Sequence, residues 1–151
     1  MAKEITVALA QIACRAADKK HNVKLMEKRI KEASQKGADL IIFPELALTG
    51  YVCRDLVYEL AEPIPEGPSL QRVVAMAKRE NLHVVFGMIE QSEKASAVIY
   101  NTAVLVGPRG FLGKYHKMYL PTHSVFEEKR YFRLGYQTPV FKTSLGNIGM
   151  I

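Results

Sequence analysis

Cysteine is scarce in this sequence, and long apolar runs are missing altogether. The 151 residues contain two cysteines, Cys14 and Cys53, too few for the disulfide framework of a small secreted domain. We expect both thiols to be reduced in the cytoplasm. No stretch approaches the roughly 20 apolar residues of a membrane-spanning helix. The first residues include Glu4 and lack the apolar core of a signal peptide. We therefore expect a cytoplasmic protein with no membrane partner.

The charge balance and the histidines indicate neither a nucleic-acid partner nor a bound metal. The net charge is +6, but the basic residues concentrate in one predicted helix, mixed with Glu27 and Glu32. Mixed charge of this kind is typical of a solvated helix face. The four histidines show no metal-ligand spacing, and no phosphate loop or dinucleotide fingerprint is present. We expect no metal and no cofactor. The histidines are His21, His83, His116 and His123.

The first half of the chain alternates strands and helices. Four apolar residues at 40–43 run into Pro44, which predicts a strand that is buried on both faces and stops there. Asn22 can cap a helix with one apolar stripe, and Gly37 can end that helix. The other elements predicted in this half are an internal strand at 3–12, a helix at 69–80 and a strand at 82–89.

The second half predicts hairpins, so the sheet should be mixed. A tight turn at 107–110 (GPRG) should reverse the chain between two strands. Residues 121–139 are largely loop with one helical turn. We expect one α/β domain over residues 1–151, with a helix-covered sheet. Its apolar last strand predicts a buried strand that is interrupted, as in an incomplete domain. The strands predicted here are 97–106, 111–117, 140–143 and 147–151.

Three charged residues stand at or near the ends of predicted strands. Glu45 follows Pro44 directly, where a charge is costly unless it is paired. Lys117 and Glu128 stand in two polar stretches farther along the chain. Two carboxylates around one ammonium would keep the lysine protonated, able to stabilise an oxyanion, and leave one glutamate free as a base. Each residue taken alone can also be an ordinary charge at the rim of the sheet.

Four stretches of the sequence are FPELALTGY at 43–51, YHKMYLP at 115–121, FEEKRYF at 126–132 and LGNIGMI at 145–151. In this order they resemble the nitrilase (carbon–nitrogen hydrolase) superfamily. They span nearly the whole chain, and together they are far more specific than any one of them. The resemblance implies an α-β-β-α sandwich of the nitrilase type, with mixed β-sheets and helices outside, of which this chain is the N-terminal portion.

The resemblance also implies a Glu-Lys-Cys site. Glu45 takes the position of the general base, and Lys117 that of the lysine that stabilises the tetrahedral intermediate. Glu128 resembles the second glutamate, which positions the lysine and the substrate, although its neighbour Glu127 remains an alternative. The nucleophilic cysteine is expected immediately after Ile151, so the domain is expected to be truncated just before it.

The cysteines that are present are poor replacements for this nucleophile. Cys53 lies beside Arg54, which could lower the pKa of a thiol, but it does not stand at the family's nucleophile position. Cys14 is expected to be a small buried residue. His116, next to Lys117, is interpreted as structural or as loop packing, and the two side chains face opposite ways if the strand continues there.

These implications favour a hydrolase of non-peptide carbon–nitrogen bonds in the full-length protein. The substrate would be a small amide, carbamoyl compound or nitrile, and no cofactor would be needed. The sequence at residues 46–56 is similar to that of the glutaminase domains of NAD synthetases. The same motifs also occur in amidases and carbamoylases of the superfamily. Family members commonly form homo-oligomers. The alternative is a non-catalytic fragment or a partner-dependent subunit, and the 151 residues alone are expected to be inactive.

Overall fold

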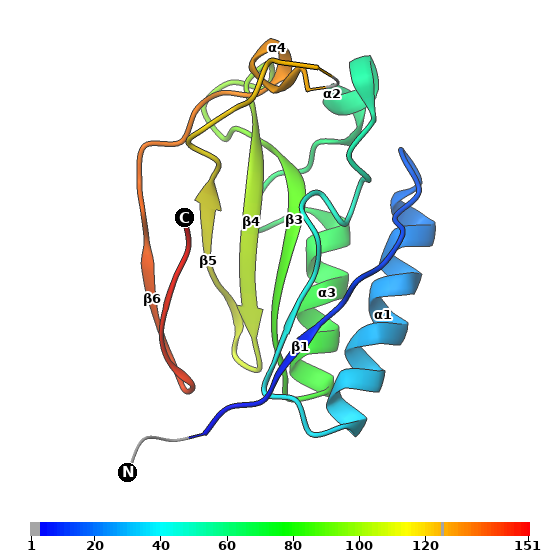
Figure 1. Ribbon diagram of the computed structural model, residues 1–151, viewed down its shortest axis with the longest axis vertical. Coiled ribbons are helices and arrows are strands. Elements are labelled where there is room, and N and C mark those ends of the chain that lie inside the picture. Colours follow the sequence, from blue (N-terminus) through cyan, green and yellow to red (C-terminus); the bar gives the residue numbers. More distant parts are fainter. Residues whose placement is uncertain (1–3, 125) are drawn as a thin grey trace.

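A mixed sheet forms the centre of the computed structural model, which describes residues 4–124 and 126–151 (Figure 1). Within these residues one sheet has five strands in the order β1-β2-β3-β4-β5, and two further strands form a separate antiparallel ribbon. β2 pairs in parallel with β1 and β3, whereas β4 runs antiparallel to β3 and β5. The mixed α/β sheet expected from the sequence is confirmed. The five strands are β1 (Val7–Leu9), β2 (Leu40–Ile42), β3 (His83–Gln91), β4 (Ile99–Gly107) and β5 (Gly110–His116).

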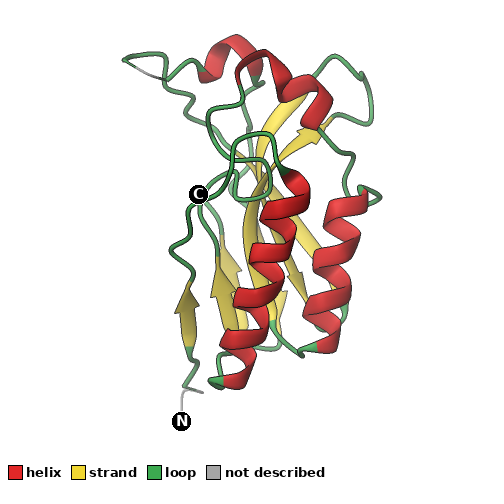
Figure 2. Cartoon of the chain, turned by 90° about the vertical axis from the view of Figure 1, so that its right-hand side faces the viewer, coloured by secondary structure: helices red, strands yellow, loops and turns green. Residues whose placement is uncertain are grey.

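Two long helices of the described chain, α1 (Lys19–Gln35) and α3 (Pro68–Arg79), lie side by side over one face of the sheet (Figure 2). We call this face the helix face. Side chains alternate along a strand, so Val84, Phe86 and Met88 of β3 pack into the core beneath the helices. Three short elements gather at one end of the sheet (Figure 1): η1 (Arg54–Leu56), α2 (Val57–Leu60) and α4 (Glu128–Tyr131). No helix among the described residues is long and apolar enough to cross a membrane.

The first strand is shorter than expected and is not internal. The sequence predicts an internal strand over 3–12, whereas β1 is the outermost strand of the sheet. Within the described residues its outer edge has no strand partner, and Leu9 is 78% exposed. An apolar run alone cannot distinguish an internal strand from an edge strand, because both carry apolar side chains where they contact a core.

Asn22 does not cap the first helix, contrary to the sequence prediction. The helix begins one turn earlier, at Lys19, and the side chain of Asp18 accepts the cap hydrogen bond from the backbone N–H of His21. Asn22 is fully buried. Its side-chain oxygen accepts from the N–H of Arg15 (2.8 Å), and its amide donates to the carbonyls of Arg15 (2.7 Å) and Leu48 (3.1 Å). Gly37 does end the helix, at φ +75°.

The ribbon of β6 (Val140–Thr143) and β7 (Gly146–Gly149) packs against the side of the sheet that the helices leave free. Phe141 lies directly over Gly113 of β5, so close that a Cβ on this glycine would stand 2.0 Å from the ring. The prediction that the strand over 147–151 is buried is wrong. Among the described residues β7 has a ladder partner on one side alone, and most of β7 is exposed. Met150 is buried, whereas Ile151 is 96% exposed.

We predict that Asn22→Leu lowers the free energy of unfolding by about 2–4 kcal/mol, because the buried carbonyl of Leu48 and the partly buried N–H and carbonyl of Arg15 lose their hydrogen bonds to the side chain. Urea denaturation of the full-length protein measures the change. Lys24→Ala, on the exposed side of the same helix, is the control and should change the free energy by less than about 0.5 kcal/mol. Wild-type stability for Asn22→Leu would contradict this role.

Candidate active site

Glu45 lies in a turn that follows β2, on the side of the sheet opposite the helices. The ladder ends with the N–H of Phe43, which donates to Val85 (2.8 Å), and the chain then turns over β3. Leu46 adopts a left-handed conformation at φ +48°. A Cβ at Gly87 of β3 would stand 2.2 Å from the backbone nitrogen of Leu46. A glycine at position 87 therefore allows the turn that carries Glu45 to lie on the sheet.

Lys117 follows β5 directly, and its backbone is fixed on both sides. Its N–H donates to the carbonyl of Asn101 on β4 (2.9 Å), and its carbonyl accepts from the N–H of Gly135 (3.0 Å). Its ammonium donates to Oε1 of Glu45 (2.7 Å) and to Oε1 of Glu128 (2.9 Å). The structure therefore brings together the three residues singled out in the sequence.

Glu128 is the buried carboxylate of this site. It is the first residue of α4, it is 3% exposed, and its Oε1 accepts from the hydroxyl of Tyr51 as well as from Lys117. Its Oε2 is buried and has no hydrogen-bond partner among the described residues. The side chain of Glu127 is 56% exposed and lies 3.8 Å from Arg130. The geometry therefore favours Glu128 over Glu127 as the partner of Lys117.

The two carboxylates keep Lys117 charged. Burial by itself lowers the pKa of Lys117, but the hydrogen bonds to Glu45 and Glu128 and their charges outweigh it, so that the pKa lies above its ordinary value of 10.5. Burial, the bond to Glu128 and the nearby negative charges raise the pKa of Tyr51. Both groups are therefore proton donors at neutral pH, and both donate to the same oxygen of Glu128.

Asn101 belongs to this site, although the sequence analysis missed it. Its side-chain amide donates to Oε1 of Glu45 (2.6 Å), so this oxygen accepts from both Asn101 and Lys117. No described residue donates to the other oxygen, Oε2, and the side chain of Glu45 is 44% exposed. The signal was a buried amide in a mostly apolar strand. An isolated polar residue in a strand rarely reveals its partner, which here lies 56 residues away.

A cleft of about 580 Å³ opens beside Glu45, Lys117 and Asn101. Its walls come from the side of the sheet opposite the helices, with Tyr115 and Tyr119 among the lining residues. The last residues after β7 also line it, including Met150 and Ile151. The chain therefore leads into the cleft where the base candidate and the ammonium lie.

The two cysteines of the chain lie outside this cleft. Cys53 is 4% exposed, and its Sγ lies within hydrogen-bond distance of the carbonyls of Thr49 (3.2 Å) and Gly50 (3.3 Å). Burial raises the pKa of its thiol, so the thiol is not activated by the neighbouring Arg54. Burial also raises the pKa of Cys14, a partly buried residue packed against the main core. Neither thiol is placed or activated for attack on a substrate in the cleft.

His116 is structural, as the sequence analysis proposed. Its Nε2 lies 2.7 Å from Glu90, and its ring stacks on Tyr100 with centroids 4.0 Å apart. The described residues include no group of three or more histidines, cysteines, aspartates or glutamates that could hold a metal ion.

Solved structures of nitrilase-superfamily proteins share this fold. An amidase from Nesterenkonia sp. superposes with a TM-score of 0.83 at 24% identity, over 99% of this chain and 55% of the amidase. The glutamine-dependent NAD⁺ synthetase from Acinetobacter baumannii superposes with a TM-score of 0.80 at 33% identity, over 96% of this chain and 27% of the synthetase. The α/β architecture is thus that of the nitrilase superfamily.

The family follows from the sequence match. The family model for carbon-nitrogen hydrolases matches residues 6–151. The nitrilase of Pyrococcus abyssi is 40% identical over 133 residues, which are 87% of this chain and 48% of that nitrilase. This chain belongs to the carbon-nitrogen hydrolase family. It spans about half the length of the curated nitrilases it matches.

We predict that Lys117 in the full-length protein titrates above pH 10.5, the ordinary lysine value, because two carboxylates favour its charged form. The pKa can be read from the NMR shift of its Cε as the pH rises. Glu128→Gln removes one of these charges and should lower that pKa, whereas Glu59→Gln, at an exposed position outside the site, should leave it unchanged. A value at or below the ordinary one would contradict the ion-pair geometry.

We also predict that Gly87→Ala displaces the turn that carries Glu45. The added methyl group collides with backbone rather than with a flexible side chain, so the free energy of unfolding should fall by about 1–3 kcal/mol. The pKa of Lys117 should fall as well, because Glu45 moves away. Gly149→Ala, whose Cβ would meet nothing closer than 3.9 Å, is the control for stability. Unchanged stability and an unchanged Lys117 pKa in Gly87→Ala would refute the close approach.

Proposed function

We propose that the full-length protein hydrolyses a carbon–nitrogen bond of a small amide, carbamoyl compound or nitrile through a Glu-Lys-Cys site. The observation that carries this proposal is the ammonium of Lys117, which lies between Glu45 and Glu128 beside a cleft. We infer that the residue after Ile151 in the full-length protein is the nucleophilic cysteine. The position of Ile151 in the wall of the same cleft supports this inference.

In the proposed reaction Glu45 is the general base. Its Oε1 is held by Asn101 and Lys117, so Oε2 takes the proton from the cysteine thiol. The thiolate attacks the substrate carbon, and the ammonium of Lys117 stabilises the oxyanion that develops on an amide carbonyl. The carbon–nitrogen bond then breaks, and the departing nitrogen takes up the proton that Glu45 holds. Water, deprotonated by Glu45, cleaves the thioester and restores the thiol.

Glu128 has a different role in this proposal. Its buried carboxylate orients Lys117, and Tyr51 holds it in place. Glu128 is buried and accepts from two donors, whereas Glu45 is half-exposed beside the cleft, so we assign the anchor to position 128 and the base to position 45. A non-catalytic role has less support, because it gives no reason to hold a half-exposed glutamate and an ammonium together at a cleft.

The family match supports an amide or nitrile as the substrate class. The matched proteins are a nitrilase, an amidase and a glutamine-dependent NAD⁺ synthetase, which differ in substrate, so the proposal stays at the level of the carbon–nitrogen bond. We also propose a cytoplasmic protein that forms a homo-oligomer. The free state of both cysteines supports the first of these assignments.

An ammonia-release assay of the full-length protein over amides, carbamoyl compounds, nitriles and glutamine tests the proposed function. We expect turnover of at least one class. We expect residues 1–151 alone to release no ammonia from any of them, because the proposed thiol lies outside them. Turnover by residues 1–151 alone, or no cysteine after Ile151 in the full-length protein, would overturn the proposed nucleophile.

We predict that Glu45→Gln and Lys117→Ala each lower kcat by about 10²-fold or more, since one removes the base and the other the charge that stabilises the oxyanion. Steady-state kinetics with the best substrate of the screen measures the loss. Glu59→Gln is the control and should keep wild-type kcat. Near wild-type rates for either of the first two variants would show that their roles are misassigned.

A further inference from the structure

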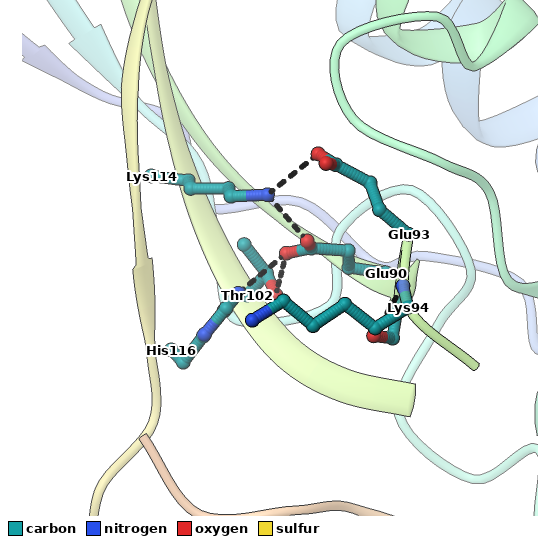
Figure 3. A network of polar contacts seen from close by, with 7 residues as sticks. Glu90, Glu93, Lys94, Thr102, Lys114 and His116 are labelled. Carbon is teal, nitrogen blue, oxygen red and sulfur yellow. Dashed lines mark hydrogen bonds and ion pairs between the residues drawn. The ribbon is translucent and has the colours of Figure 1, made fainter. Parts of the chain in front are cut away.

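A second buried carboxylate lies on the helix face of the sheet, beyond the candidate site. Glu90 of β3 has a side chain that is 2% exposed, and three groups from β4 and β5 surround it (Figure 3). Its Oε2 accepts from the hydroxyl of Thr102 (2.9 Å) and lies 2.7 Å from Nε2 of His116, while its Oε1 accepts from Lys114. We call these four residues the Glu90 cluster.

The Glu90 cluster is built from the neighbours of the site residues. On β4, Thr102 joins the cluster and Tyr100 stacks on His116, whereas Asn101 between them points to Glu45. On β5, His116 joins the cluster and the next residue, Lys117, bonds Glu45 and Glu128. Successive side chains of a strand point to opposite faces. The two polar networks therefore hold the same backbone from its two sides.

The position of Lys117 depends on the register in which β5 pairs with β4. The β4–β5 ladder has a register shift between Leu105 and Val106, and the pairing of Thr102 with His116 comes at the far end of the ladder from it. A slip of one residue moves every side chain of a strand to the other face. It would turn Lys117 toward the helix face and away from Glu45. The bonds of Glu90 to Lys114 and His116, two residues apart, are lost in that slipped register.

The chemistry of the cluster also sets it apart from ordinary core packing. Burial raises the pKa of Glu90, but the hydrogen bonds to His116 and Lys114 outweigh it and bring the pKa below its ordinary value. A buried ion pair is often no more stabilising than apolar residues of the same volume, and its best-attested use is to specify one arrangement among several. An ionic cluster at the end of β5 fits that use.

We propose that Glu90, together with His116 and Thr102, positions Lys117 by fixing the register at the end of β5. Glu90, Lys114 and His116 do not line the cleft, whereas Thr102 is among its lining residues. The side chains of the cluster bond one another and not those of Glu45 or Lys117, so Glu90, His116 and Thr102 are positioning residues. This inference rests on the proposed function, in which Lys117 stabilises the oxyanion. It predicts that a change on the helix face lowers the rate of a reaction on the opposite face.

Steady-state kinetics of full-length variants tests the positioning role. His116→Ala and Glu90→Gln should each lower kcat about tenfold and leave KM within about twofold, because a misplaced lysine weakens binding of the transition state more than of the substrate. His116→Gln, which can still donate to Glu90, should recover part of the loss. Should Glu90→Gln fail to fold, Thr102→Val removes a single bond to Glu90 and should lower kcat about threefold.

Glu62 provides the matched control. It is 4% exposed and lies beside Glu90 in a short bridge, but its partners are Lys19 of α1 and Ser69 of α3. Glu62→Gln should therefore lower stability as Glu90→Gln does and keep kcat within about twofold. An equal loss of kcat in Glu62→Gln would mean that general destabilisation, not the register of β5, causes the effect, and would overturn the proposal.

A double variant separates the two proposals. In the Lys117→Ala background, His116→Ala should cause no further loss of kcat, because the residue that it positions is gone. Full activity of Lys117→Ala would refute the proposed function itself. An inactive Lys117→Ala together with wild-type kcat in folded His116→Ala and Glu90→Gln would refute the positioning role and leave the proposed function standing.

Discussion

The ion pairs of one ammonium with two carboxylates are the interaction on which the site depends. Glu128 is almost fully buried, and a buried carboxylate is costly without a positive partner. Lys117 supplies this partner and holds the half-exposed Glu45 at the same time. The charge on Lys117 therefore stabilises the loop around α4 and orients the base candidate. The nitrogen of the Lys117 ammonium thus both pairs with the buried Glu128 and holds Glu45 in place.

The two faces of the sheet have different tasks. One face meets α1 and α3 and carries the larger apolar cluster together with the Glu90 cluster, while the other carries Glu45, Asn101 and Lys117 beside a second, smaller apolar cluster. Alternate residues of β4 and β5 point to opposite faces. A single register of these strands therefore places both the Glu90 cluster and the residues of the candidate site. The sheet that supports the apolar core therefore also positions the charged residues of the site.

The sequence indicated the charged centre of the site but not its surroundings. Glu45 and Lys117 follow strands closely, and all three charged residues stand in stretches that resemble motifs of one family, so that resemblance indicated a shared site. Gly87 and Asn101 could not be assigned in this way, since their roles depend on backbone approaches and on partners far along the chain. Asn22 was misread as a cap because a buried asparagine and a capping one look alike in sequence. Burial raises the pKa of Cys53, and the sequence around Cys53 and Arg54 does not show that this thiol is buried.

The contact between Phe141 and Gly113 sets the spacing between the ribbon and the sheet. The ribbon pairs with itself, and its ladder partners in the described chain are its own two strands. Side-chain packing therefore decides how near β7 lies to β5, and with it how far Met150 stands from Lys117 across the cleft. Gly113 does not line that cleft. Because glycine has no side chain, however, the ribbon can approach the sheet at this position, and this approach governs the width of the cleft.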